Sequence, residues 1–200
     1  MLEFEPTTHT YRWNGSIVPG TTSIIGQWLR VGDMYVNIFT GATVNARMFE
    51  DAGLWGTSVH TLIDYYLDGD LDTTNLTASQ HYTLANFKNW LEEMDVEVLS
   101  HEQRLYSKKY KYAGTYDIKA KIDDRLWVID VKTGDYSLAG PQLAAYVQLD
   151  KEADRSRATR HRAVLHLPKD GNYKFITLTD TADWSFFLSR LNTHNYIKGR

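Results

Sequence analysis

Three charged residues in the middle of the chain, Asp117, Asp130 and Lys132, are of types that could hold a metal ion and act beside it. Asp130 and Lys132 are separated by one residue, so on a strand both side chains lie on the same face. Carboxylate oxygens suit Mg²⁺ or Mn²⁺, and a neighbouring lysine could hold a water molecule or a phosphate oxygen. An Asp-x-Lys tripeptide alone is common at solvated sheet edges, so a metal site is predicted only if the surrounding residues also fit one.

The segments around these residues predict a β-hairpin. Residues 118–122 and 125–131 are rich in Ile, Val and Trp, and Asp123-Asp124 between them is a turn pair without glycine. If the two strands pair symmetrically about that turn, Asp117 lies directly opposite Asp130. Two facing carboxylates repel each other, and a bound divalent cation would turn that repulsion into ligation.

A helix is expected after the hairpin. Gln142 and Tyr146 are four residues apart, so on a helix they share a face, and Pro141 fits the first turn. The hairpin would therefore be followed by an amide and a phenol that point the same way.

Taken together, these motifs resemble the PD-(D/E)XK nucleases. The matching segments are Gly114-Thr-Tyr-Asp117, Ile129-Asp-Val-Lys-Thr-Gly134 and Gln142-Leu-Ala-Ala-Tyr146. They are most similar to the branch that includes the RecB nuclease domain, Cas4-type nucleases and phage exonucleases. That branch also has an upstream Gly-x-x-x-His pattern, here Gly56-Thr-Ser-Val-His60.

The resemblance implies a role for each matching residue. Lys132 would be the catalytic lysine, with Gln142 and Tyr146 positioning the lysine or the DNA backbone. Mg²⁺ or Mn²⁺ would be the cofactor. The implied metal ligands are His60, Asp117, Asp130 and the backbone carbonyl of Val131.

The function implied by the resemblance is metal-dependent hydrolysis of DNA, most closely that of an exonuclease in phage-type recombination, repair or replication. Such proteins work in the cytoplasm, in a bacterial host if phage-encoded, beside a single-strand annealing or binding protein, and some form rings. Three alternatives stay open: an endonuclease of the same fold (a junction resolvase or restriction-type enzyme), an inactive DNA-binding scaffold, and an unrelated magnesium-binding protein. Retention of His60, Asp117, Asp130 and Lys132 together argues against the scaffold.

Two helices are expected before the hairpin and supply the histidine. Residues 35–51 predict one helix, Gly53 a break, and residues 55–67 a second helix. His60 lies beside the apolar face of the second helix. Asp64, one turn later, could orient its imidazole, reach a water ligand of the metal, or remain a surface charge. That apolar face consists of Val59, Leu62, Ile63 and Tyr66.

Further candidates for metal and DNA binding flank the hairpin. Glu102, in an expected strand over 96–106, could bind a second metal ion or a water molecule, or be an exposed carboxylate. A basic run interleaved with tyrosines could follow a single strand, and residues 151–162 form a second basic segment. The DNA contacts expected from the first run are Lys108, Lys109, Lys111 and Tyr112.

The fold expected is a single mixed α/β (α+β) domain over residues 1–200, with a restriction-endonuclease-like core. A central mixed sheet flanked by helices would occupy 53–178, and a final helix 179–200. Residues 1–22 would add a β-hairpin turning at Asn14-Gly15, with His9 as a DNA contact or a structural residue. Other expected elements are a short helix from Thr22 or Ser23 through Leu29, a capped helix over 77–94, and strands over 163–167 and 173–178.

Composition narrows the alternatives. The 200 residues include no cysteine, which excludes disulfides, zinc–thiolate sites and iron–sulfur clusters and separates the chain from the Cas4-type nucleases. The net charge is −3, so DNA binding would need a local basic groove. The sequence has no run of about 18 apolar residues and no basic, then apolar, N-terminus, so neither a membrane span nor a secretory signal is expected.

Overall fold

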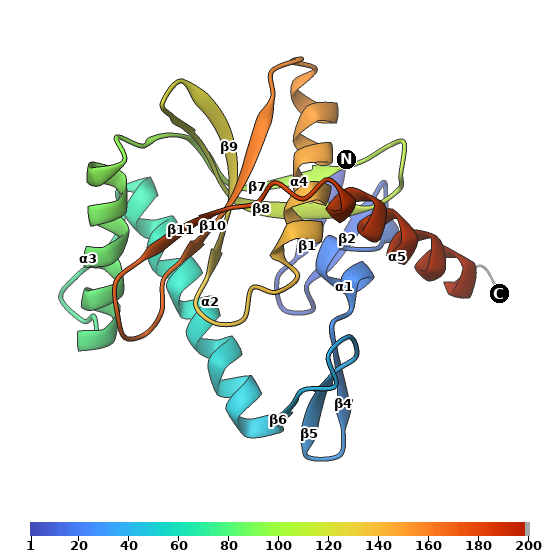
Figure 1. The fold of residues 1–200 in the computed structure, drawn as a ribbon, viewed down its shortest axis with the longest axis horizontal. Helices are drawn as coiled ribbons and strands as arrows, with labels where there is room; N and C mark the ends of the chain where they lie inside the picture. Colours follow the sequence, from blue (N-terminus) through green and yellow to red (C-terminus); the bar gives the residue numbers. More distant parts are fainter. Residues whose placement is uncertain (199–200) are drawn as a thin grey trace.

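The computed structural model describes residues 1–198, which form a mixed five-stranded sheet between helices (Figure 1). The strand order is β11-β10-β9-β8-β7, with β9 and β10 parallel and the other neighbours antiparallel. This agrees with the mixed α/β fold expected from the sequence. The strands are β7 (Glu97–Tyr106), β8 (Ala113–Ile122), β9 (Arg125–Lys132), β10 (Arg160–His166) and β11 (Lys174–Thr177).

The predicted β8–β9 hairpin is confirmed, with the expected register from Ile118 opposite Ile129 to Ile122 opposite Arg125. Asp123 and Asp124 form the turn, and both have positive φ (49° and 59°). A two-residue turn with φ above zero at both positions matches the right-handed twist of the strands it joins. Aspartate tolerates this conformation better than most residues, which explains a tight turn without glycine.

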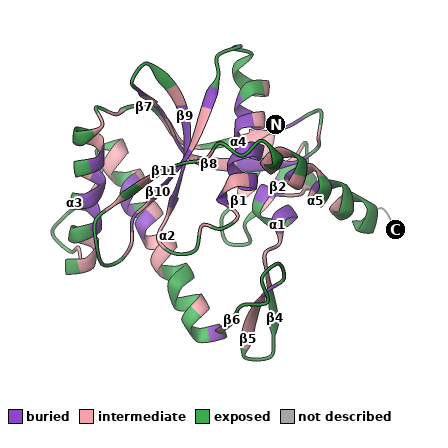
Figure 2. Cartoon of the chain, viewed as in Figure 1, coloured by how far each residue is buried: buried purple, intermediate pink, exposed green. Residues whose placement is uncertain are grey.

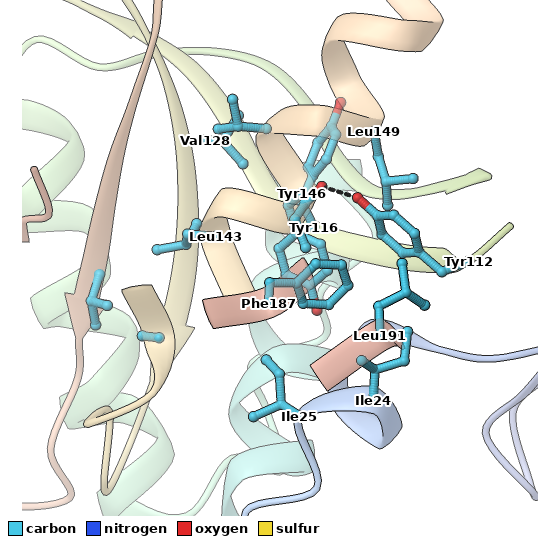
Figure 3. Packing of buried hydrophobic residues seen from close by; sticks show 14 residues of the cluster. Ile24, Ile25, Tyr112, Tyr116, Val128, Leu143, Tyr146, Leu149, Phe187 and Leu191 are labelled. Atoms are coloured by element: carbon cyan, nitrogen blue, oxygen red, sulfur yellow. Dashed lines mark hydrogen bonds between the residues drawn. The ribbon is translucent and has the colours of Figure 1, made fainter. Parts of the chain in front are cut away.

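Helices cover both faces of the sheet and create two apolar clusters (Figures 1 and 2). On one face, α2 (Ala46–Asp68) and α3 (Ala78–Glu93) bury Val59, Phe87 and Trp90 against the strands. The other face carries α4 (Ala139–Asp154), α5 (Ala182–Lys198) and α1 (Thr21–Ile25). The close view in Figure 3 shows this second cluster, in which side chains of α4 and α5 meet Ile24 and Ile25 of α1.

The N-terminal segment is a three-stranded antiparallel sheet of β1 (Leu2–Glu5), β2 (Thr10–Trp13) and β3 (Ser16–Val18). The predicted turn at Asn14-Gly15 is confirmed, with φ of 48° and 80° at its two residues. Trp13 stacks on Tyr106 of β7 at 4.5 Å between ring centroids. The small sheet therefore packs against the edge strand of the central sheet.

The helix predicted over residues 35–51 is wrong for residues 35–45, whereas residues 46–51 form the first turns of α2. A second three-stranded sheet of β4 (Trp28–Val31), β5 (Met34–Asn37) and β6 (Thr43–Asn45) projects from the body with the start of α2 (Figure 1). The strands Trp-Leu-Arg-Val and Met-Tyr-Val-Asn are joined by a turn with Gly32 at φ 57°. Their β-branched and aromatic residues favour strands, a signal that the small residues further along obscured.

The helix break predicted at Gly53 is also wrong, because α2 spans 23 residues and includes Gly53 without interruption. The helix begins after Asn45, whose side chain accepts a hydrogen bond from the backbone N–H of Arg47. One interior glycine costs about 1 kcal/mol relative to alanine, too little to break so long a helix. The short helix predicted through Leu29 ends at Ile25, and its N-terminal cap is Gly20, not Thr22 or Ser23.

The remaining expected helices and strands are confirmed, with boundaries that differ by one to three residues; the last two residues of the expected final helix, 199 and 200, lie outside the described residues. Thr77 and Gln80 form the predicted capping box of α3, and Pro141 lies in the first turn of α4. No helix among residues 1–198 is long and apolar enough to cross a membrane.

Candidate active site

A cleft of about 530 Å³ gathers most of the charged residues singled out in the sequence. Its wall includes Gly56 and His60 from α2, Glu102 from β7 and Asp117 from β8. Asp130 and Lys132 of β9 and Gln142 and Tyr146 of α4 line the same cleft. Segments as far apart as residues 4 and 146 thus meet in one place.

Three ligand-type side chains converge in the cleft. One atom from each of His60, Glu102 and Asp117 lies within 4.8 Å of the other two. The Nδ1 of His60 is 3.5 Å from Asp117 Oδ1 and 3.8 Å from Glu102 Oε1. Among residues 1–198, no other set of three histidine, aspartate or glutamate side chains is as tightly grouped. Glu102 therefore lies beside the predicted ligands.

An interruption in two strands brings Glu102 and Asp117 together. Tyr116 packs in the cluster beside α4, yet Ile118 packs in the cluster beside α2 and α3. Residues two apart on a regular strand share a face, so the alternation of β8 breaks at Asp117. Glu102 occupies the neighbouring position on β7, between the pairs His101–Ile118 and Gln103–Tyr116, and has a left-handed φ of 44°.

Asp130 and Lys132 form a second group in the cleft. The Nζ of Lys132 is 2.6 Å from Asp130 Oδ2, which confirms that the two side chains share a face. Asp130 is 1% exposed, and its Oδ1 accepts a hydrogen bond from Gln142 Nε2 at 3.1 Å. Asp130 thus holds the lysine while the amide of Gln142 holds Asp130.

Gln142 and Tyr146 share the predicted helix face. Gln142 Nε2 also donates to the hydroxyl oxygen of Tyr146 at 2.9 Å. The tyrosine ring packs closely against Gly114 of β8, where a Cβ atom would lie 2.8 Å from Tyr146 Cε1 and 2.6 Å from Thr21 Oγ1. Only glycine permits this approach of α4 and α1 to the strand, so Gly114 of the sequence motif has a packing reason.

The charges in the cleft shift the pKa values of its titratable groups. The negative charge of Asp117 outweighs desolvation and raises the pKa of His60 to about 9. Burial raises the pKa of Asp117 to about 7, although the charge of His60 opposes the shift. Without a cation, His60 therefore carries a proton near neutral pH, and Asp117 is divided between its charged and neutral forms.

Lys132 and Tyr146 keep their protons. Burial alone would lower the pKa of Lys132, but the charges of Asp130 and Asp117 together outweigh burial and raise it. Burial, and then the nearby charge of Asp130, raises the pKa of the Tyr146 phenol well above its ordinary value. The site therefore combines a positive lysine with a neutral phenol.

The donor set of His60, Glu102 and Asp117 fits a divalent cation. The set combines one imidazole nitrogen with the oxygens of two carboxylates. Carboxylate oxygens are typical ligands for Mg²⁺ and Mn²⁺. Asp117 Oδ2 also accepts a hydrogen bond from the backbone N–H of Val131 at 2.6 Å, which fixes the carboxylate. Asp130 lies outside this group of three, and ligation by Asp130 and the Val131 carbonyl stays a prediction.

The expectation that Asp64 orients His60 is wrong. Asp64 Oδ1 lies 2.8 Å from Nδ1 of His101, and the other ring nitrogen of His101 is 3.4 Å from Asp68. Asp64 and Asp68, one turn apart on α2, thus share a histidine of β7. Sequence reasoning missed His101, because only the packing of α2 on β7 brings these residues together.

Tyr112 cannot stack on a DNA base as predicted. Its side chain is fully buried, its hydroxyl donates to the carbonyl of Ala145 at 2.8 Å, and Figure 3 shows it among side chains of α4 and α5. Alternation with lysines suggested an exposed ring, but the tyrosine enters the core. The neighbouring Lys108, Lys109 and Lys111 are exposed outside the cleft wall, and their contact with DNA stays a prediction.

Two arginines of the second basic segment are neutralised by ion pairs, whereas its Lys151, Arg155 and Arg157 are exposed. Arg160 is buried and pairs with Asp150 at 2.7 Å and with Asp154 at 2.5 Å. Arg162 pairs with Asp183 at 2.7 Å, at the start of α5. These two arginines fasten helices to β10 and do not form the expected basic patch. His9, by contrast, lines the cleft.

Comparison with known proteins gives little further information. No protein-family model matches the chain, and no curated protein matches it. Among solved structures, it is similar to a "putative exonuclease" from Eubacterium rectale, with 13% sequence identity and a TM-score of 0.49. The alignment covers 72% of this chain and 65% of the other, so this chain spans less than two thirds of that protein.

Proposed function

We propose that the chain is a metal-dependent deoxyribonuclease that hydrolyses phosphodiester bonds. The observation that supports this most strongly is the joint placement of two groups in one cleft. One is the cation-type donor set of His60, Glu102 and Asp117, and the other is a lysine fixed by Asp130. A structural ion pair would need no ligand set beside it.

Each group has a distinct role in this proposal. His60, Glu102 and Asp117 would hold a divalent cation, which would supply Lewis-acid activation of the phosphodiester and of the attacking water. Lys132, protonated and held by Asp130, stabilises the negative charge that develops on the phosphate oxygens. Gln142 keeps Asp130 in place, and the neutral phenol of Tyr146 supports Gln142.

Within this class we favour an exonuclease of phage-type recombination, repair or replication that works beside a single-strand annealing or binding protein. The support is the resemblance of the motifs around Asp117, Asp130 and Gln142 to that branch of the PD-(D/E)XK nucleases. An endonuclease of the same fold uses the same catalytic groups, so the substrate must distinguish the two.

The experiment compares end-labelled linear DNA with a covalently closed circle, in Mg²⁺, in Mn²⁺ and in EDTA. Wild type is assayed with Lys132→Ala, and with Lys151→Ala as a matched control on an exposed lysine of α4. We expect metal-dependent loss of linear DNA only. The Lys132 variant should lose about 10²–10³-fold in rate, as for removal of a group that stabilises transition-state charge.

The other outcomes discriminate between the alternatives. Nicking of the circle would indicate an endonuclease and contradict the exonuclease proposal. Cleavage that persists in Lys132→Ala would remove the proposed role of this lysine. If wild type cuts neither DNA in either metal, the enzyme proposal is contradicted in favour of a DNA-binding scaffold.

A further inference from the structure

A second cavity, of about 300 Å³, adjoins the cleft beside Lys132. Thr22, Lys132 and Gln142 line both spaces, so they form the boundary between them. The rest of the wall comes from two segments that can be followed in Figure 1. One is residues 25–28, where α1 ends and β4 begins, and the other joins β9 to the start of α4 and contributes Asp135, Tyr136, Leu138 and Ala139. Nothing in the proposed hydrolysis uses this second cavity.

Two aromatic side chains line the cavity, and each packs against the ring of another residue. Trp28 packs on Phe49 of α2 at 5.2 Å between ring centroids, and Phe49 in turn stacks on Tyr35 at 4.1 Å. Tyr136 packs against the ring of His166 at 5.1 Å. Both rings are half-buried, so they are held in place and yet remain accessible from the cavity.

Polar groups stand beside these rings. Gln27 Nε2 donates to Asp135 Oδ2 and to Ser137 Oγ, each at 3.0 Å, and these contacts join the two wall segments. Gln27 and Asp135 both line the cavity. A flat apolar surface next to amide and carboxylate groups matches a nucleobase, which has a π-face and a polar edge.

We propose that this cavity binds the base of a nucleotide next to the scissile phosphate. The inference rests on the proposed nuclease function and adds a substrate class to it. Because Lys132 is at the boundary, a phosphate held there in the cleft leaves an adjoining base beside Trp28 and Tyr136. A base inside the cavity cannot be paired, so the strand is cut where it is single-stranded or frayed.

The experiment uses oligonucleotides in which every linkage except one is a nuclease-resistant phosphorothioate. The cleavable linkage is placed at either end or at the centre, and the nucleotide on one side of it is either normal or abasic. The values of kcat/KM are measured for wild type, Trp28→Leu and Tyr136→Leu. Leu29→Ala, on an exposed neighbour of Trp28 in β4, is the matched control.

We expect the abasic nucleotide on one side to reduce kcat/KM of wild type and of Leu29→Ala about tenfold, since stacking of one base is worth about 1–3 kcal/mol. Both cavity variants should cut the normal oligonucleotide about tenfold more slowly than wild type does. For the abasic oligonucleotide, their kcat/KM should lie within twofold of the wild-type value. Such a result would also show that the catalytic groups of both variants are intact.

Two results overturn the inference, and they differ from failure of the proposed function. One is cleavage by wild type with no abasic penalty on either side. The other is a penalty of equal size in wild type and in both cavity variants, which would place the base elsewhere. If wild type cuts no oligonucleotide in either metal, the nuclease function itself is contradicted, and the base-binding role with it.

Discussion

Glu102 lies beside Asp117 on adjacent strands, at a point where the alternation of side chains in β8 breaks and the backbone of β7 is left-handed. Two carboxylates next to each other repel, and a non-glycine residue with φ of 44° is strained by about 1–3 kcal/mol. A chain selected for stability alone would avoid both features. Their coincidence beside His60 is explained if a cation binds there.

The first prediction is that Glu102→Asn stabilises the metal-free protein and weakens cation binding. Asparagine tolerates left-handed backbone and removes one negative charge. We expect a gain of about 1 kcal/mol, or about 2–4 °C in Tm, for thermal unfolding in EDTA. The rise in Tm that Mn²⁺ produces in wild type should shrink in the variant.

Asp124→Gly is the control for this measurement. Asp124 is also left-handed, with φ of 59°, but it lies in the β8–β9 turn and not in the cleft. It should gain stability and keep the full response to Mn²⁺. The cation site would have to be placed elsewhere if Glu102→Asn kept that response as well.

The second prediction is that affinity for Mn²⁺ increases with pH. The raised pKa values of His60, about 9, and of Asp117, about 7, mean that a cation must displace protons from these groups. Between pH 7 and 9 mainly the His60 proton is displaced, so the apparent Kd should improve by up to about tenfold per pH unit. Below pH 7 the Asp117 proton adds to the slope.

Isothermal titration calorimetry with Mn²⁺ from pH 6 to 9 measures this dependence and the protons released. His60→Asn should bind more weakly, and its slope between pH 7 and 9 should be flatter. A Kd that does not change with pH in wild type would exclude His60 and Asp117 as ligands.

The sequence predicted the hairpin, its register and the helix after it because those features depend on local pattern. Asp123 and Asp124 set the turn, alternating residues set the strands, and Gln142 and Tyr146 are one helical turn apart. The register then follows from the turn position alone. These local features position Asp130, Lys132 and Gln142.

What could not be predicted depends on contacts between distant segments. The break in alternation at Asp117 arises where β8 lies between β7 and β9, and no local residue pattern marks it. The pairing of Asp64 with His101, and the burial of Tyr112 beneath α4 and α5, likewise follow from how helices dock on the sheet. The strands β4–β6 were missed because the small residues that follow Asn37 outweighed the strand signal of the β-branched and aromatic residues.

The third prediction ranks two variants of the α4 face. Gln142→Leu removes the donor to Asp130 and leaves a buried carboxylate oxygen without that partner, which should cost about 1–3 kcal/mol. Tyr146→Phe removes only the acceptor of the second amide hydrogen and should cost about 1 kcal/mol. We expect DNA hydrolysis to fall more in the glutamine variant, because Asp130 then positions Lys132 poorly.

Urea unfolding and initial rates of DNA hydrolysis, measured at the same pH, test this ranking. Equal effects of the two variants would mean that Tyr146 acts on the substrate directly. A stable Gln142→Leu protein with wild-type rates would show that Asp130 needs no support from α4.

The last prediction concerns Gly56, one turn before His60 on α2 and on the wall of the cleft. A Cβ atom there would meet only Thr133 Oγ1, at 3.5 Å, so alanine fits without a clash. Gly56→Ala and the exposed Gly53→Ala should each stabilise the helix by about 1 kcal/mol. Because Gly56 lines the cleft, however, the added methyl group of the first variant reduces the space where a DNA backbone would have to approach α2. We therefore expect Gly56→Ala to lower kcat/KM for DNA while Gly53→Ala leaves it unchanged, and neither to affect bis(4-nitrophenyl) phosphate, a small diester. Wild-type DNA hydrolysis by Gly56→Ala would show that the strand does not pass over this turn of α2.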